Sequence, residues 1–507
     1  MRKNIIVLSS ILLLGACNLN LAPENVLVDQ TVYSNPKTAQ AALMGAYVRM
    51  AVFLAGAPED QNNYSYPSFC WMAGDLGTYN LKARDGGYSS YTALEEGIYD
   101  HSVRDGDILS CWLKGYNAID YANNVIDGIQ RYGDMNDPVN RELVAEARFL
   151  RAFVYFNLQK MFGDGALTGK GEGLGLILRD KPYDGYTPDQ IQTRASVSET
   201  WRFIINDLAE AAEFLPGNPG APESRFRASA PVVNALLSRV YLYMGSYVND
   251  RECMTRVIDI SRALLMTGDY SFNTHVSALR EIFPLNAYDK SLSSSYPDPT
   301  SRSPEIIFYQ PSRISTELFP NGISSPYFTK KMLLVEPGWV AGTYASGDHR
   351  GILEGSVAGL VGTGSTNHYP SDLTSLKYSN TDGYDDVVFF RLAEVKLNLA
   401  EALARRDGIT EEALGHLNDV RCRPFLEEDK PVALSMSDFS STESFIDEIL
   451  EERNRELAFE SHRRWDLIRS GKAIRNESLS DGMKILPIPD YEVNISKGKI
   501  QQNSAFR

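Results

Sequence analysis

Residues 145–162 constrain the fold of this chain more than any other segment. Read at helical spacing, their apolar residues form one broad face that leaves little of the helix circumference polar. That face comprises Phe149, Leu150, Ala152, Phe153, Val154, Tyr155, Phe156, Leu158, Met161 and Phe162. Because burial of one large apolar side chain contributes about 1.5–3 kcal/mol, the pattern predicts a central helix with other helices packed on several sides. Gly163 is expected to end this helix in a left-handed conformation.

The same helical periodicity recurs along most of the chain. It predicts helices at residues 37–53, 108–132, 196–215, 229–244, 251–265, 387–405, 412–421 and 442–470. Two neighbouring pairs of these helices have the size of the helical hairpins in TPR proteins. Ser196 and Glu199 have the spacing of a capping box at the start of one helix. The predicted fold class is therefore mainly α, with TPR-like helical hairpins that form one scaffold.

Two stretches break the helical pattern, residues 56–98 and residues 267–386. Both are rich in Gly, Tyr, Ser and Asn, and the second contains the strand-like run 306–309. A long, loop-rich insertion in a helical protein, here with a few short strands, is more often functional than not. Since no linker rich in Pro, Gly and Ser divides the chain, we expect one domain. Its predicted parts are a scaffold at about 37–266 and 387–470 and an insertion at about 267–386, all within residues 17–507.

The N-terminus has the pattern of a lipoprotein signal peptide. A basic start precedes the apolar run 5–14, which is too short for a membrane span of ~20 residues. Leu14-Gly-Ala-Cys17 fits a bacterial lipobox, so residues 1–16 are predicted to be removed and Cys17 to carry the lipid. A generic signal peptide with a nearby cysteine is the alternative. No other stretch approaches membrane-spanning length, so the mature protein is expected to be soluble but tethered.

The net charge limits the binding partners of the chain, and the cysteine spacing indicates the state of its thiols. The net charge of −15 and a pI near 5.0 argue against nucleic acid and against a surface attracted to anionic lipid. The cysteines after the lipobox have neither CxxC nor zinc-like spacing, so buried free thiols are expected. They are Cys70, Cys111, Cys253 and Cys422.

No catalytic or metal-binding motif stands out, so neither an enzyme nor a cofactor is predicted. The 6 histidines are scattered, and neither HExxH nor G-x-S-x-G occurs. A surface glycoside hydrolase stays open as an alternative, because pairs of carboxylates occur throughout an acidic chain. Asp382-Gly-Tyr-Asp385-Asp386 offers oxygen ligands for calcium, but it lacks the alternation of an EF-hand loop. A solvated turn is the favoured interpretation, and no metal site is predicted.

Several segments carry short motifs in a fixed order along the chain. The central helix contributes Glu146-Ala-Arg-Phe-Leu-Arg-Ala-Phe-Val-Tyr-Phe and then Phe162-Gly-Asp. Later blocks include Phe390-Arg-Leu-Ala-Glu-Val and Arg464-Trp-Asp-Leu-Ile-Arg. Further segments of this kind lie at 36–47, 112–123, 227–242, 417–421, 452–460, 486–492 and 501–503. Together they resemble, in order, the signatures of the SusD/RagB family of outer-membrane lipoproteins, and the resemblance extends from the anchor to the tail.

The resemblance implies a function as well as a fold. A SusD-like lipoprotein would sit on the outer membrane, exposed at the cell surface, as a lid over a SusC-like TonB-dependent transporter. It would help to capture a nutrient, most often an oligosaccharide or polysaccharide. A peptide, as in RagB-like members, is the alternative ligand. The signature charges lie on helices with apolar stripes, so we expect some of them to form buried ion pairs that fix the scaffold. They are Glu394, Glu401, Arg421, Glu456 and Arg464.

Binding of a glycan requires aromatic faces for the sugar rings and polar groups around their edge. The two irregular stretches supply both, and helical packing does not account for their aromatic residues. The predicted platform is Trp71, Tyr88, Tyr91, Tyr296 and Trp339, with Asp75 and Arg84 as hydrogen-bonding residues at the edge. The competing interpretation is that these rings only pack the loops onto the helical body.

Overall fold

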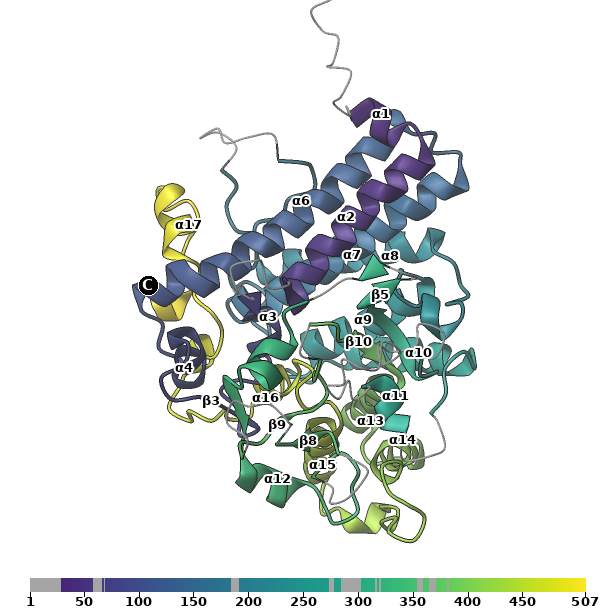
Figure 1. Ribbon diagram of the computed structural model, residues 1–507, viewed down its shortest axis with the longest axis vertical. Helices are drawn as coiled ribbons and strands as arrows, with labels where there is room; N and C mark the ends of the chain where they lie inside the picture. The colour runs from purple at the N-terminus through teal and green to yellow at the C-terminus, as the bar shows by residue number, and fades with distance from the viewer. Residues whose placement is uncertain are drawn as a thin grey trace, which may run out of the picture.

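The computed structural model places most of the chain in one helical body (Figure 1). It describes residues 29–57, 66–67, 69–183, 191–272, 278–283, 302–314, 317–318, 321–352, 359–363, 371–380 and 383–507. The predicted lipidation site Cys17, the predicted platform residue Tyr296 and Asp382 of the acidic turn lie outside the described residues.

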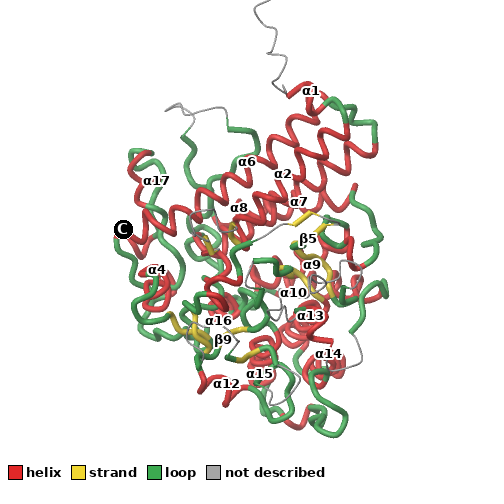
Figure 2. The backbone as a smooth tube through the Cα atoms, viewed as in Figure 1, coloured by secondary structure: helices red, strands yellow, loops and turns green. Residues whose placement is uncertain are grey.

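Helices dominate the described residues, which confirms the predicted fold class (Figure 2). In chain order they are α1 (Asp29–Tyr33), α2 (Pro36–Ala55), α3 (Phe69–Met72), α4 (Ser89–Glu96), α5 (His101–Val103), α6 (Leu109–Tyr132), α7 (Pro138–Phe162), α8 (Val197–Phe214), α9 (Ala230–Gly245), α10 (Arg251–Met266), α11 (Ala278–Ile282), α12 (Pro337–Thr343), α13 (Leu392–Asp407), α14 (Glu411–Cys422), α15 (Thr442–Glu456), α16 (Arg463–Arg469) and α17 (Asp490–Ile495).

The strands of the described residues are short and pair two by two, each pair antiparallel. The pairs are β1 (Gly56–Ala57) with β2 (Tyr66–Pro67), β3 (Leu81–Ala83) with β7 (Leu333–Val335), β4 (Ile306–Gln310) with β10 (Val387–Arg391), β5 (Arg313–Ile314) with β6 (Glu317–Leu318), and β8 (Val361–Gly362) with β9 (Thr374–Ser375).

Helix α7 is the central helix that the sequence predicts. It packs on α2, α6 and α8, and α2, α6 and α7 run side by side in Figure 1. Its aromatic face meets the β4–β10 pair: the Phe149 ring lies 5.4 Å from Phe308, and the Phe153 ring lies 5.6 Å from Phe389. Edge-to-face contacts of this kind add to the area buried. Helix α7 therefore joins the helices to the β4–β10 pair within one hydrophobic core.

The end of α7 differs from the prediction. Gly163 has φ −72° and ψ 116°, which is extended rather than left-handed backbone. Glycine is needed there because a Cβ atom would lie 2.7 Å from the carbonyl oxygen of Gln159. The C-terminal tail closes this end of the helix, since the Asn503 side-chain amide donates to the carbonyl oxygens of Phe162 (3.1 Å) and Leu486 (2.8 Å).

The remaining helices form the predicted hairpins. Helix α9 packs on α10, α13 packs on α14, and α10 packs on α13 across the insertion. The capping box at the start of α8 is confirmed, because the Ser196 hydroxyl and the Glu199 carboxylate each accept a backbone N–H from the other residue. The helix pairs and the capping box are features that a short stretch of sequence can specify, so the scaffold follows from local sequence.

Two predicted helices are partly wrong, one at its start and one in its middle. Residues 387–391, predicted as the start of a helix, form β10 and pair with β4, whose strand-like run 306–309 is confirmed. Their Val-Val-Phe-Phe sequence fits a fully buried strand, and α13 begins only at Leu392. The predicted helix 442–470 is broken between α15 and α16, where Phe459 and Ser461 have positive φ. The Ser461 N–H donates to Asp75 Oδ2 at 2.9 Å, so a distant loop holds this break.

Helix α2 is long and apolar enough to cross a membrane by length and composition, contrary to the expectation for the region after the signal peptide. Half of its most apolar window is buried inside the protein, and it packs on α6 and α7. The Tyr47 hydroxyl donates to Glu146 of α7 at 2.5 Å in a buried contact. These contacts place α2 in the helical body.

Buried ion pairs hold the signature helices, as the sequence predicts. Glu394 pairs with Arg239 at 2.6 Å and Glu401 with Arg469 at 2.6 Å, both buried. Arg464 is an exception, because its guanidinium donates to the backbone carbonyls of Leu76, Leu94 and Lys484. Arg421 lies nearer the surface and donates to the carbonyl oxygen of Val432.

Glu456 is the centre of a larger group of charges, called the ionic cluster below. It pairs with Arg391 at 2.5 Å, with Arg350 at 3.1 Å and with Arg423. Burial alone would raise the pKa of the Glu456 carboxyl, but these three guanidinium groups hold that pKa well below its usual value. The ionic cluster comprises Glu305, Asp348, Arg350, Lys377, Arg391, Arg423, Glu452, Glu456 and Glu460.

The cysteines of the described residues are free and buried, as expected. They are Cys70, Cys111, Cys253 and Cys422. Burial raises the pKa of the Cys70 thiol to about 12, so this group stays protonated and packs as a small apolar side chain.

Candidate ligand-binding site

The two irregular stretches meet on one side of the helical body. Strand β3 pairs with β7, with Leu81 opposite Val335 and Ala83 opposite Leu333. Beyond the strand ends, the Glu336 N–H donates to the Asn80 carbonyl (3.1 Å). The surface formed by residues 79–88, 331–339 and 371–373 is called the loop face.

Arg84 links three segments of the loop face. Its backbone N–H donates to the Met332 carbonyl at 2.9 Å, and its Nε donates to the Lys331 carbonyl at 2.7 Å. Its Nη2 pairs with Asp372 at 2.5 Å, and the two side chains are 15% and 31% exposed. Arg84 was predicted to bond a ligand at the edge of a platform; the structure places it at the surface with its guanidinium partly engaged by the protein.

Tyr88 is one of two exposed tyrosines of the loop face, 43% exposed beside the 50% of Tyr79. A turn closed by the Gly87 N–H and the Arg84 carbonyl (2.9 Å) holds it next to Arg84. The Tyr91 ring lies 5.2 Å away beneath it. Tyr91 itself is only 2% exposed, so it supports the Tyr88 ring rather than meeting solvent.

Trp71 and Asp75 are packing residues, which corrects their prediction as ligand contacts. Trp71 is 6% exposed, and its Nε1–H donates to the Phe459 carbonyl at 3.0 Å. Asp75 is 0% exposed, and burial raises the pKa of its carboxyl to about 7. Both residues fasten the segment after α3 to the break between α15 and α16, so for them and for Tyr91 the competing packing interpretation holds.

Trp339 is half-buried on α12, directly after β7. Its ring packs edge-on against Tyr344 at 5.4 Å and Phe459 at 5.7 Å. The structure therefore keeps three of the predicted residues at or near the surface of the loop face, namely Arg84, Tyr88 and Trp339. Tyr296 is not among the described residues.

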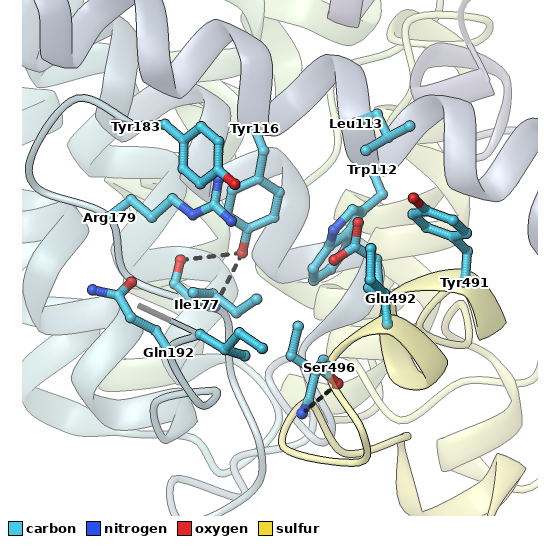
Figure 3. A pocket seen from close by; sticks show the side chains of 13 residues that line it. Trp112, Leu113, Tyr116, Ile177, Arg179, Tyr183, Gln192, Tyr491, Glu492 and Ser496 are labelled. Atoms are coloured by element: carbon cyan, nitrogen blue, oxygen red, sulfur yellow. Dashed lines mark hydrogen bonds between the residues drawn. The ribbon is translucent and has the colours of Figure 1, made fainter. Parts of the chain in front are cut away.

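Sequence reasoning missed a second feature, a cleft of about 260 Å³ on another side of the protein (Figure 3). Its walls come from α6, from the segments around Ile177 and Ile191, and from α17 with the residues after it. The lining residues are Trp112, Leu113, Tyr116, Ile177, Arg179, Tyr183, Ile191, Gln192, Tyr491, Glu492, Ile495, Ser496 and Ile500. This feature is called the α17 cleft below.

Aromatic rings and two opposite charges line the α17 cleft. Arg179 lies over the rings of Tyr116 and Tyr183, 5.1 Å and 5.2 Å from their centroids. In Figure 3 these residues form one side, and Glu492 and Tyr491 form the other. Burial raises the pKa of the Glu492 carboxyl, and the guanidinium of Arg179 acts in the opposite direction.

Comparison with known proteins agrees with the fold. The model of the family described as "Starch-binding associating with outer membrane" matches residues 77–242, and that of the "SusD family" matches residues 362–481. A SusD-like protein of Formosa agariphila is 24% identical over 511 residues, which cover 92% of this chain and 91% of that protein.

Solved structures show the same architecture. A SusD superfamily protein from Parabacteroides distasonis superposes with a TM-score of 0.71 at 18% identity, over 93% of this chain and 99% of the other. A SusD-like carbohydrate binding protein from Bacteroides vulgatus superposes with a TM-score of 0.65 at 19% identity, over 87% and 85% of the two chains.

Paired helices that carry an irregular loop face define a class of TPR-like scaffold proteins. Two family models, one on each side of the central part of the insertion, match this chain. The chain is therefore similar to the SusD-like family in sequence and in fold.

Proposed function

We propose that this chain is a lipid-anchored protein of the outer membrane that captures a glycan at the cell surface. In this account it delivers the glycan to a SusC-like TonB-dependent transporter. The observation that carries the proposal is the match of residues 77–242 to a family described as starch-binding and associated with the outer membrane. A similar fold in a protein named as carbohydrate binding supports it.

The loop face is the proposed glycan site. Tyr88 offers an exposed ring for the apolar face of a sugar, and the Arg84–Asp372 pair beside it offers donors and acceptors for hydroxyl groups. Trp339 follows the partner strand of the same sheet and adds a second, half-buried ring. Tyr296 stays a predicted member of this platform.

Binding without catalysis is part of the proposal. Asp75 has the raised pKa of a general acid, but its carboxyl is completely buried and cannot reach a substrate. The acids of the ionic cluster are paired with arginine or lysine. Turnover of a bound oligosaccharide by stringently purified protein would contradict this part.

A glycan array tests the main claim most broadly. Residues 18–507, purified without the lipid anchor, are applied to the array and in parallel to a peptide library. We expect retention of one class of glycan. Binding to peptides with no retained glycan would instead support the RagB-like alternative.

The anchor and the transporter are tested in the native membrane. Because Cys17 is the proposed lipid attachment site, Cys17→Ala should release the protein from the membrane fraction; a variant that stays bound after a high-salt wash places the anchor elsewhere. Affinity purification of the wild-type chain in mild detergent should recover a large TonB-dependent receptor. Recovery of the free chain alone would contradict the partnership.

A further inference from the structure

The α17 cleft shares no lining residue with the loop face. It opens between α6 and α17, whereas the loop face surrounds β3 and β7, and the two lie apart in Figure 1. Whatever the α17 cleft binds would therefore occupy a site separate from the proposed glycan platform. Tyr183 and Tyr491, 47% and 49% exposed, flank its opening.

The charged side chains of the α17 cleft are Arg179, which lies over two tyrosine rings, and Glu492, on which the charge of Arg179 acts. Among the described residues, the Glu492 carboxylate and the Arg179 guanidinium have neither an ion pair nor a hydrogen bond. Both nevertheless lose part of their contact with water, Glu492 by partial burial and Arg179 by its place between two tyrosine rings. Charged groups that have lost water without gaining a hydrogen-bond partner favour a ligand that supplies hydrogen bonds.

Contacts within the protein hold the floor of the α17 cleft. Trp112 and Tyr116 are buried on α6, and their rings lie 4.8 Å apart. The Tyr116 hydroxyl accepts from the Ile177 N–H at 3.0 Å and donates to the Ile177 carbonyl at 3.1 Å. These bonds fix the segment that carries Arg179 against α6.

The size and charge of the α17 cleft select the ligand. A volume of about 260 Å³ lies just below the roughly 300–1,000 Å³ of sites for drug-sized molecules, so it suits a single ring. An anionic ligand would meet Glu492 and a cationic one would meet Arg179, so a neutral molecule is favoured. Exposed tyrosine faces on both flanks suit the apolar faces of a pyranose, whose hydroxyls both donate and accept.

We propose that the α17 cleft is a second carbohydrate site that binds one neutral sugar residue. Tyr183 and Tyr491 pack against the sugar ring, and Arg179 and Glu492 hydrogen-bond its hydroxyl groups. The proposal takes the class of ligand from the proposed function but is independent of the loop face. A glycan long enough to leave the loop face could be held at this second site as well.

The test uses residues 18–507 with Tyr88→Ala, which weakens the loop face. Saturation-transfer NMR is recorded with neutral probes (methyl α-glucoside, methyl β-galactoside, methyl α-mannoside and methyl β-xyloside), with glucuronate, and with the zwitterions leucine and phenylalanine. We expect signals from at least one methyl glycoside, reduced at least fivefold by adding Tyr183→Ala or Tyr491→Ala. Tyr132→Ala is the matched control, because Tyr132 is an exposed tyrosine at the other end of α6.

Each other outcome overturns the proposal. It is wrong if no methyl glycoside gives a signal, or if the cleft variants leave the signal unchanged. A signal from leucine or phenylalanine that Glu492→Ala removes would make the α17 cleft an amino-acid site. These outcomes are distinct from failure of the proposed function, which the glycan array reports with the unmodified loop face. The substituted tyrosines are surface residues, so a thermal melt is expected to show folded protein in every case.

Discussion

Glu456 and Glu492 show what separates a structural carboxylate from a candidate binding group in this protein. Glu456 is completely buried, receives three guanidinium groups and has a lowered pKa. Glu492 is half-buried, has no ion pair among the described residues, and has a raised pKa. Complete pairing in the ionic cluster fixes structure, whereas the incomplete pairing in the α17 cleft leaves polar groups for a ligand.

The ionic cluster also explains how the insertion stays on the scaffold. Arg350 and Lys377 belong to the insertion, and they pair with Glu452 (2.5 Å) and Glu460 (2.6 Å) on or just after α15. Such buried pairs are costly to break one partner at a time, because the remaining charge is left buried. The only members of the ionic cluster that lie in segments resembling the family signatures are Arg391, Glu452, Glu456 and Glu460.

The largest difference in stability is expected between two single variants that carry the same substitution, one in each region. Glu456→Gln removes the charge that compensates Arg350, Arg391 and Arg423, and it should cost about 3–5 kcal/mol in the free energy of unfolding. Glu492→Gln should stay within about 0.5 kcal/mol of the wild type, since its carboxylate has no partner to lose. Urea denaturation measures both. Equal costs would remove the distinction between the two regions.

A second matched pair separates buried from exposed aromatic residues. Trp71→Ala should cost about 3–5 kcal/mol of stability, because it empties a packed site and orphans the Phe459 carbonyl. Tyr88→Ala should cost no more than about 1 kcal/mol, since its ring is half in solvent. If Tyr88→Ala destabilised the protein as much as Trp71→Ala, the Tyr88 ring would be a packing residue too.

The pH dependence of stability should carry the signature of Asp75. Burial raises its folded-state pKa to about 7, while the carboxyl of an unfolded Asp has a pKa near ~3.9. Between these values the folded protein binds more protons than the unfolded chain, so the free energy of unfolding falls as pH rises. Asp75→Asn should reduce this fall by about 1–2 kcal/mol between pH 5 and pH 7. Urea titrations at the two pH values test it, and an unchanged or steeper fall in the variant would contradict it.

The scaffold could be predicted because its signals are local. Helical periodicity locates the apolar face and the end of α7, although the helix begins earlier, at Pro138. The capping box locates the start of α8 at Ser196. Tertiary contacts decided what the sequence could not: β10 exists because β4 lies beside it, and the break at Ser461 exists because Asp75 accepts its N–H. In both cases the deciding contact comes from a residue far away along the chain.

The site was harder to predict for a related reason. Loops lack a periodicity that separates inside from outside, so Trp71 and Tyr88 look alike in sequence although one is buried and the other exposed. The α17 cleft is assembled from α6, from the segment at Arg179 and from Glu492 near the C-terminus. Trp112 and Tyr116 are buried on α6, and nothing in their spacing along the helix shows that their edges line a cleft.

The most direct test of the account is a calorimetric titration at the loop face. The glycan selected by the array is titrated into the wild type, into Tyr88→Ala and into the exposed-tyrosine control Tyr132→Ala, with a thermal melt of each. We predict a Kd about tenfold weaker for Tyr88→Ala, or about 1.4 kcal/mol, with the wild-type Kd for Tyr132→Ala and similar melting temperatures throughout. An unchanged Kd for Tyr88→Ala would contradict the claim that the loop face binds the glycan.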